Sequence, residues 1–296
     1  MVNLASLIWG VSSFFAANLF TAFPIFIGKE PIPLWYPYNS SASPYFELSH
    51  IFQFLAQNSM WYNYNILDIF YITIVVITAG QFKILTWELE NICFSSLLAS
   101  GYDKQRILHF QETLANSNGI TEHDKCLDIY QFMLTDEYVK QFRIKIIKVV
   151  NFHRDILDFC DKLENFLATS LLMMFLSILS HCVLILYGTS LSTSMIHRLQ
   201  MAVYFFSAVV ESFLVAYPSD FLFEQTQKLQ FGLYSTPWYL CSKKLASTFK
   251  FWHFCLEKSF GLSLGKFKIF DLTAYAWVMK TSFSYFTVLR QRNMND

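Results

Sequence analysis

The feature that most constrains this chain is an uncharged apolar run near its amino end. The run extends from Leu4 to Ile27, and its clearly polar members are serine, threonine and asparagine. A run of about 24 residues can cross roughly 30 Å of hydrocarbon as a helix and is too long for the core of a signal peptide. It therefore predicts a membrane-spanning helix.

Further apolar segments of similar length follow along the chain. They cover residues 48–79, 166–189, 199–223 and 265–291. The composition agrees with a membrane protein, because 54% of the residues are hydrophobic and 15% are charged. We predict an all-α integral membrane bundle with about five transmembrane helices. Pro218 is expected to kink or end the helix that contains it.

The polar composition excludes several classes of function. The formal net charge is zero, whereas nucleic-acid binding needs a basic surface. The six cysteines are scattered singly without a CxxC pair, which is typical of packing residues rather than of metal or redox sites. The motifs HExxH, GxSxG and a glycine-rich phosphate loop are also absent. We expect no enzyme activity, no cofactor, no metal site and no nucleic-acid partner.

Lysine and arginine predict the orientation of the spans. Residues 82–163 contain ten of them and residues 224–270 contain seven, whereas the loops after the first and third spans contain one each. By the positive-inside rule, the amino end and the two rich segments are cytoplasmic, and the carboxyl end is extracellular. The loop after the first span is then outside, and its Asn39 begins an Asn-Ser-Ser triplet that matches a glycosylation acceptor.

The segment 82–163 also shows helical periodicity. Its apolar positions recur in threes and fours at Leu85, Leu89, Ile92 and Leu97, and again at Ile144, Ile147 and Val150. This pattern predicts helices that prolong the spans into water.

Three polar side chains in the interior of the predicted spans carry specific expectations. Asn18 needs a partner in lipid and is expected to face other helices or a ligand. Asp68 belongs either to an ion or ligand path or to a structural contact with another helix, and Glu211 should face inward. A multispan transporter or membrane enzyme that uses Asp68, Glu211 and Lys280 as a buried charge relay is an alternative, although internal repeats are not evident.

The last apolar segment has a lysine in its middle. One helical face carries Thr273, Trp277, Lys280, Ser284, Val288 and Gln291. A partly polar face predicts a helix that sits in lipid and lines a wet space. Alternatively, Lys280 snorkels or pairs with Glu211 or Asp220.

The residues from Lys280 to Leu289 read KTSFSYFTVL. They resemble the closing signature of insect odorant receptors, Lys-x-Ser-x-Ser-Tyr-Phe-x-x-Leu, and Gly265-Lys266-Phe267 is also similar to the family. Gustatory receptors share the architecture but usually end in Thr-Tyr, several apolar residues and Gln-Phe, whereas this chain has Ser284-Tyr285 and Gln291-Arg292.

The resemblance implies seven spans and a tetrameric, odorant-gated, non-selective cation channel in the plasma membrane of olfactory neurons. Its expected partners are a co-receptor subunit, a small volatile apolar ligand, membrane lipid, and monovalent and divalent cations in transit. With five spans, this chain is expected to begin at the family's third span. The pore residues implied by the resemblance and by the polar face are Lys280, Ser284, Val288, Gln291 and Arg292. A ring of four arginines would oppose cations, so Arg292 favours a tuning subunit in a mixed tetramer.

Combined with the resemblance, the charge pattern divides the chain into five regions. These are two spans with an extracellular loop at 1–81, a cytoplasmic helical segment at 82–163, two further spans at 164–223, an anchor region with the pore-lining helix at 224–291, and an extracellular tail at 292–296.

Odorants are small and apolar, so their site should be an aromatic and aliphatic cavity in the outer halves of the spans. The candidate ligand residues share helix faces and are Phe15, Asn18, Leu19 and Ala22; Gln57, Trp61 and Tyr64; and Met201, Tyr204 and Phe205. Ordinary helix packing is the alternative for each of them, and only their convergence in space distinguishes the two.

Overall fold

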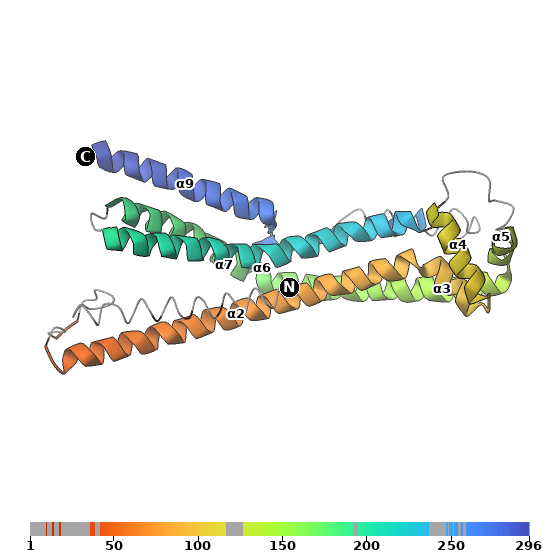
Figure 1. Cartoon of the computed structure of the whole chain (residues 1–296), viewed down its shortest axis with the longest axis horizontal. Helices are drawn as coiled ribbons and strands as arrows, with labels where there is room; N and C mark the ends of the chain where they lie inside the picture. Colours follow the sequence, from red (N-terminus) through yellow and green to blue (C-terminus); the bar gives the residue numbers. More distant parts are fainter. Residues whose placement is uncertain are drawn as a thin grey trace. The chain divides into compact units, whose positions relative to one another are not determined.

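A computed structural model describes most of the chain (Figure 1). The described residues are 42–116, 127–191, 195–236 and 259–295, together with Gly10, Phe14, Asn18, residues 36–38 and some positions between 247 and 256. The elements in order are α2 (Tyr45–Glu90), α3 (Ile92–Ala99), α4 (Lys104–Asn116), α5 (Leu127–Met133), α6 (Asp136–Leu191), α7 (Met195–Ser235), β1 (Ser263–Leu264), β2 (Lys268–Ile269) and α9 (Leu272–Asn295). The predicted all-helical membrane bundle is confirmed.

Within the described residues, three helices are long and apolar enough to cross a membrane: α2, α6 and the part of α7 from Met201 to Ser235. Helices α2, α6 and the whole of α7 contain the predicted spans 48–79, 166–189 and 199–223. In their most apolar windows only 39%, 11% and 22% of the residues are buried by the rest of the chain. Leaving that much apolar surface in water would be costly, so these windows need lipid around them. The predicted span 4–27 lies outside the described residues except at three positions.

The chain folds into two compact units. The first, here called the span unit, comprises residues 1–74, 176–218 and 275–296. The second, the charged unit, comprises residues 75–175 and 219–274. Helices α2 and α6 run without a break through positions 81–82 and 163–164, where the sequence suggested two region boundaries. The five-region division stays a prediction.

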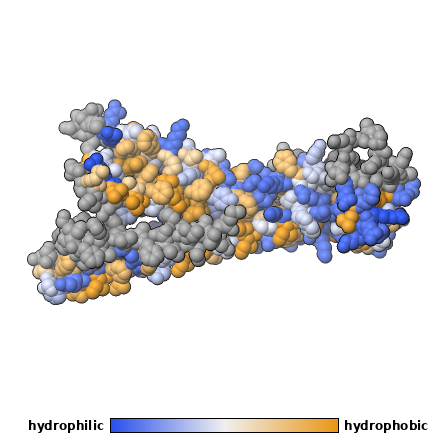
Figure 2. Space-filling view, viewed as in Figure 1, coloured by the Kyte–Doolittle hydropathy of each residue, from blue (hydrophilic) through white to orange (hydrophobic). Residues whose placement is uncertain are grey.

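The charged unit holds the largest fully buried side chains of the described residues. These are Phe82, Leu85, Leu89, Ile92, Leu97, Phe110, Met133, Tyr138, Phe142, Leu222, Leu229 and Leu233. The predicted apolar stripe from Leu85 to Leu97 is therefore confirmed as part of a core. On the face drawn in Figure 2, hydrophilic residues gather over the outside of α3 to α5, whereas hydrophobic residues gather over α7 and α9.

The second apolar pattern of the charged segment lies on a helix, as predicted, but it is not the buried stripe of α6. Ile144, Ile147 and Val150 are 50%, 50% and 38% exposed. The buried stripe of α6 instead consists of Tyr138, Phe142, Ile146, Val149, His153, Ile156, Cys160 and Leu163. Both stripes have helical spacing, but the buried one is longer and includes the aromatic residues, so burying it removes more apolar surface from water.

The last helix begins later than the sequence suggested. Residues 263–269 form a small antiparallel hairpin in which Ser263 pairs with Ile269 and Leu264 pairs with Lys268. Helix α9 then starts at Leu272, whose N–H donates to Asp220 Oδ1 at 3.2 Å, and the Ala274 N–H donates to Asp271 Oδ1 at 2.7 Å. These carboxylates cap the first turn of the helix, which follows the hairpin.

Pro218 does not end its helix. Helix α7 contains Pro218 and continues to Ser235, so that part of the expectation was wrong. A proline in a membrane helix is tolerated when its neighbours satisfy the freed backbone groups. The boundary between the span unit and the charged unit falls directly after this residue.

Candidate functional site

The first span meets α2 at the few positions of it that the structure describes. The Asn18 side-chain amide donates to the Phe14 carbonyl at 2.8 Å, and the amides of Asn18 and Asn58 exchange hydrogen bonds at 3.3 and 3.4 Å. The rings of Phe14 and Trp61 lie 5.0 Å apart at an angle of 58°. Asn58 is therefore the partner that Asn18 requires in lipid.

Sequence reasoning missed Asn58 as a contact residue. Asn58, Trp61 and Asn65 are spaced by three and four residues and so share one helical face. That spacing is the signal that identifies the contact.

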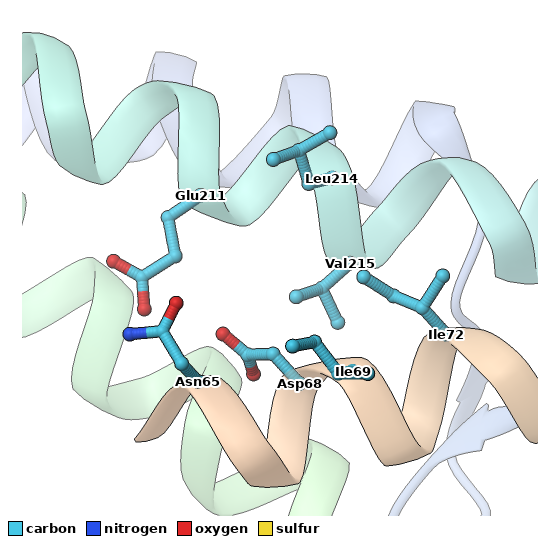
Figure 3. Close-up of a pocket in the computed structure, with 7 residues that line it drawn as sticks. All are labelled: Asn65, Asp68, Ile69, Ile72, Glu211, Leu214 and Val215. Carbon is cyan, nitrogen blue, oxygen red and sulfur yellow. The ribbon is translucent and has the colours of Figure 1, made fainter. Parts of the chain in front are cut away.

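A small cavity lies between α2 and α7 within the span unit (Figure 3). Its lining consists of Asn65, Asp68, Ile69 and Ile72 from α2, and Glu211, Leu214 and Val215 from α7. The side chains of Asn65, Asp68 and Glu211 point toward one another from the two helices. The predicted inward orientation of Glu211 agrees with this geometry.

The cavity is too small for an odorant. Its volume of about 10 Å³ is close to the space that a single water molecule needs, whereas pockets for small molecules are of order 300 Å³ or more. The geometry fits the structural alternative for Asp68, in which it contacts a second helix.

The candidate ligand residues fall into different environments. Gln57 and Trp61 are half-buried on α2, while Tyr64 is 62% exposed. On α7, Met201, Tyr204 and Phe205 are all half-buried. Asn18 and Trp61 both lie where the first span contacts α2. Phe15, Leu19, Ala22 and Asn39 lie outside the described residues. The ligand site and the glycosylation site stay predictions.

Helix α9 has two distinct faces. On one, Val278 and Ser282 are buried, the Tyr275 hydroxyl donates to the Val209 carbonyl at 3.2 Å, and its ring meets Phe213 edge-on at 6.0 Å. The other face, here called the free face, is exposed in the part of the chain that the structure describes; it carries Thr273, Trp277, Lys280, Ser284, Val288 and Gln291. The side chain of Arg292 lies outside the described residues. The partly polar stripe expected from the sequence is thus the free face of α9.

Lys280 is exposed on this free face. The ion pairs of the described part of the chain join Asp158 to Lys162 and Glu224 to Lys228, each at 2.7 Å, and neither includes Lys280. Glu211 lines the cavity instead, and Asp220 caps α9. The alternative in which Lys280 pairs with one of these carboxylates is not seen among the described residues.

The described thiols have the surroundings of structural cysteines. Cys93, Cys160 and Cys182 are free and buried. Burial, together with the nearby charges of Asp161 and Glu164, raises the pKa of Cys160 to about 12, so its thiol stays protonated and unreactive. Within the same described residues, no group of three His, Cys, Asp or Glu side chains is placed to hold a metal ion.

Comparison with known proteins agrees with this architecture. The family model described as 7tm Odorant receptor matches residues 1–283. The chain is similar to Odorant receptor 83a of Drosophila melanogaster, with 19% identity over 93% of this chain and 64% of the relative. It is also similar to Putative odorant receptor 85e of the same fly, with 19% identity over 96% of this chain and 61% of the relative. The chain thus spans about three fifths of the length of these curated relatives.

Solved structures show the same fold. The insect olfactory receptor OR5 from Machilis hrabei in complex with eugenol superposes with a TM-score of 0.73 and 16% identity, over 98% of this chain and 66% of that one. A second structure of the same receptor gives a TM-score of 0.73 and 17% identity, over 97% of this chain and 65% of that one. These relatives are receptors rather than enzymes. With a family model that matches nearly its whole length, this multi-pass membrane chain belongs to the odorant receptor family of insects.

Proposed function

We propose that this chain is the odorant-binding subunit of a ligand-gated, non-selective cation channel, assembled as a heterotetramer with a co-receptor subunit. The observation that carries the proposal is the free face of α9, which is partly polar although the helix is rich in aromatic and apolar residues. In a closed symmetric ring, equivalent faces from several subunits meet on one axis and can surround a wet pore.

The proposed pore wall follows the free face from Lys280 through Ser284 and Val288 to Gln291. Val288 is 61% exposed and would form the narrow apolar ring, with Gln291 next to it. Arg292 follows in sequence, and a ring of such cations would repel permeating cations. A mixed tetramer reduces the number of these charges and so favours conduction.

We place the ligand among the outer halves of the first, second and fourth spans, close to the zone where Asn18 meets Asn58 and Trp61 meets Phe14. An apolar, aromatic lining suits a small volatile ligand. The similar receptor OR5 has been solved in complex with eugenol, a small aromatic molecule, which supports this ligand class. The proposed location is the plasma membrane of olfactory neurons, with the charged unit cytoplasmic and the carboxyl end outside.

The decisive experiment records currents from cells that express this chain alone, a co-receptor alone, or both, during application of an odorant panel. Odorant-evoked cation current that requires both chains supports the proposal. If the paired cells show no odorant response beyond that of the co-receptor alone, while this chain reaches the cell surface, the proposed role is wrong.

Two variants locate the ligand site and the pore in the same assay. Trp61→Ala should shift the odorant dose response without lowering surface expression, and Arg292→Leu should raise conductance or change the permeability ratios. Met60→Ala serves as the control for the first variant, because Met60 lies next to Trp61 in sequence but is 66% exposed. An unchanged dose response for Trp61→Ala removes that residue from the ligand site, and unchanged permeability ratios for Arg292→Leu remove Arg292 from the pore mouth.

A further inference from the structure

The tip of the β1–β2 hairpin exposes an aromatic ring between two lysines. Phe267 is 86% exposed, more than any other large hydrophobic side chain that the structure describes. Lys266 and Lys268 beside it are also exposed. An exposed aromatic ring flanked by two ammonium groups suits a boundary between apolar and polar surroundings.

The hairpin holds this tip in a defined geometry. Gly265 and Lys266 have φ values of 57° and 65°, and the Phe267 N–H closes the turn on the Leu264 carbonyl at 3.0 Å. Two successive left-handed residues are typical of a tight hairpin turn. A side chain at Gly265 would come within 2.7 Å of the end of the Leu172 side chain on α6, and the positive φ at this position favours glycine.

Hydrogen bonds fasten the turn to α6. The Ser263 hydroxyl donates to Glu164 Oε1 at 2.5 Å, the Lys266 ammonium donates to Asn165 Oδ1 at 2.7 Å, and the Gly265 N–H donates to the Ala168 carbonyl at 3.0 Å. The tip is therefore fixed at the level of residues 164–168 of α6.

That level is where α6 changes from a charged helix to an apolar one. Glu164 is its last charged residue, and the helix continues to Leu191 without Asp, Glu, Lys or Arg. Beyond this point large apolar side chains are uncovered, including Phe166 at 69% and Met173 at 62% exposure. An apolar stretch of that length begins at the edge of the bilayer, so the hairpin tip lies at the boundary between lipid and water.

We propose that Lys266, Phe267 and Lys268 form a membrane anchor, in which Phe267 inserts among the lipid headgroups and the two ammonium groups bind the phosphates of anionic lipids. Aromatic rings and lysine stems both favour this interfacial region. The charge pattern selects lipid over a second protein chain, because lysine is depleted from protein interfaces whereas anionic headgroups attract it. Lys266 keeps donors free after its bond to Asn165, since an ammonium group has three.

The test is photocrosslinking of the full-length chain, purified into nanodiscs of phosphatidylcholine alone or of phosphatidylcholine and phosphatidylserine in equal parts. The probe is p-benzoyl-phenylalanine, incorporated at position 267, and mass spectrometry identifies its adducts. Two positions with matched exposure serve as references: Phe206, in an apolar span, and Phe231, in the charged unit beyond the span, at 68% and 69%.

Lipid adducts at position 267 that match those at 206 and exceed those at 231 support the anchor. Adducts to a second receptor chain instead of lipid overturn it, and so does a lipid yield no greater than that at position 231. Cell-surface expression equal to that of the unmodified chain verifies that each probe is tolerated.

The lysines are tested through lipid preference. Lys266→Gln and Lys268→Gln should each lower the ratio of phosphatidylserine to phosphatidylcholine adducts at position 267 by up to about fivefold. Lys228→Gln is the control, because that lysine is exposed on α7 and pairs with Glu224 rather than with a residue of the hairpin. A ratio unchanged by the loss of both hairpin lysines contradicts the anionic-lipid part of the proposal.

Discussion

The two units of this chain use apolar residues in opposite ways. The charged unit has the more polar surface, yet it contains all of the largest fully buried side chains among the described residues. The span unit leaves residues such as Leu67, Met195 and Phe206 at 65%, 77% and 68% exposure. The hydrophobic effect in water drives the packing of the charged unit. Lipid solvates the apolar side chains of the span unit, so polar contacts between helices, such as that of Asn18 with Asn58, contribute more to its packing.

The sharpest test of this comparison truncates one phenylalanine in each unit. Phe142 is fully buried in the charged unit, where its ring lies 5.9 Å from Tyr138 and 5.6 Å from Phe249. Phe142→Ala should cost about 3–5 kcal/mol of stability and strongly reduce surface expression, because it leaves a cavity. Phe206→Ala should leave both nearly unchanged. Thermal unfolding in detergent and surface labelling provide the measurements, and equal losses for the two variants would break the comparison.

The second prediction concerns the stability of the β1–β2 hairpin, which belongs to the charged unit. Gly265→Ala places a methyl group at a φ of 57° and within 2.7 Å of Leu172. The left-handed backbone alone costs about 1–2 kcal/mol for a residue with a side chain, and the close contact adds to this. We expect a lower unfolding temperature for Gly265→Ala and almost no change for Gly188→Ala, a helical glycine with open space around it. Similar unfolding temperatures for the two variants would contradict the hairpin geometry.

The amide pair tests the polar contacts of the span unit. Asn58→Ala removes the partner of Asn18 and should cost about 1 kcal/mol, the usual range for hydrogen bonds between membrane helices. Asn63 is the matched control, since its side-chain amide donates to its own helix at the Ser59 carbonyl and is exposed. Thermal unfolding in a lipid nanodisc should separate the two variants. If Asn63→Ala is as destabilising as Asn58→Ala, the contact with Asn18 contributes nothing specific.

The smallest expected effect is a pH dependence of the charged unit. Burial lowers the pKa of His153 below its ordinary value of 6.5, and its ring lies 6.2 Å from that of Trp252. The folded state therefore binds fewer protons than the unfolded state in mild acid, so stability is complete above the ordinary pKa and falls as the pH drops below it. His153→Gln should flatten this dependence. Unfolding temperatures measured on both sides of that pKa provide the test, and an unchanged slope for the variant would exclude His153 as its source.

The sequence alone determined that this is a helical membrane protein, and it determined which faces of some single helices are buried or exposed. Uncharged runs of span length, the distribution of lysine and arginine, the closing motif and the stripe from Leu85 to Leu97 are all local patterns. Each reflects the surroundings of one segment, lipid or water, so each can be read without knowing its neighbours. The free stripe of α9 was predictable for the same reason.

Only the tertiary structure decided which segments meet. Two sets of apolar residues on α6 have helical spacing. The set that includes Phe142 is buried because other segments pack against it, whereas the set that includes Ile144 is exposed. The hairpin was missed because Lys266 adopts a left-handed conformation that lysine does not signal. The partnership of Asn18 with Asn58, and the opposition of Asp68 and Glu211, join residues far apart in the chain. Such pairings depend on how helices pack, and side-chain periodicity within one segment carries no information about them.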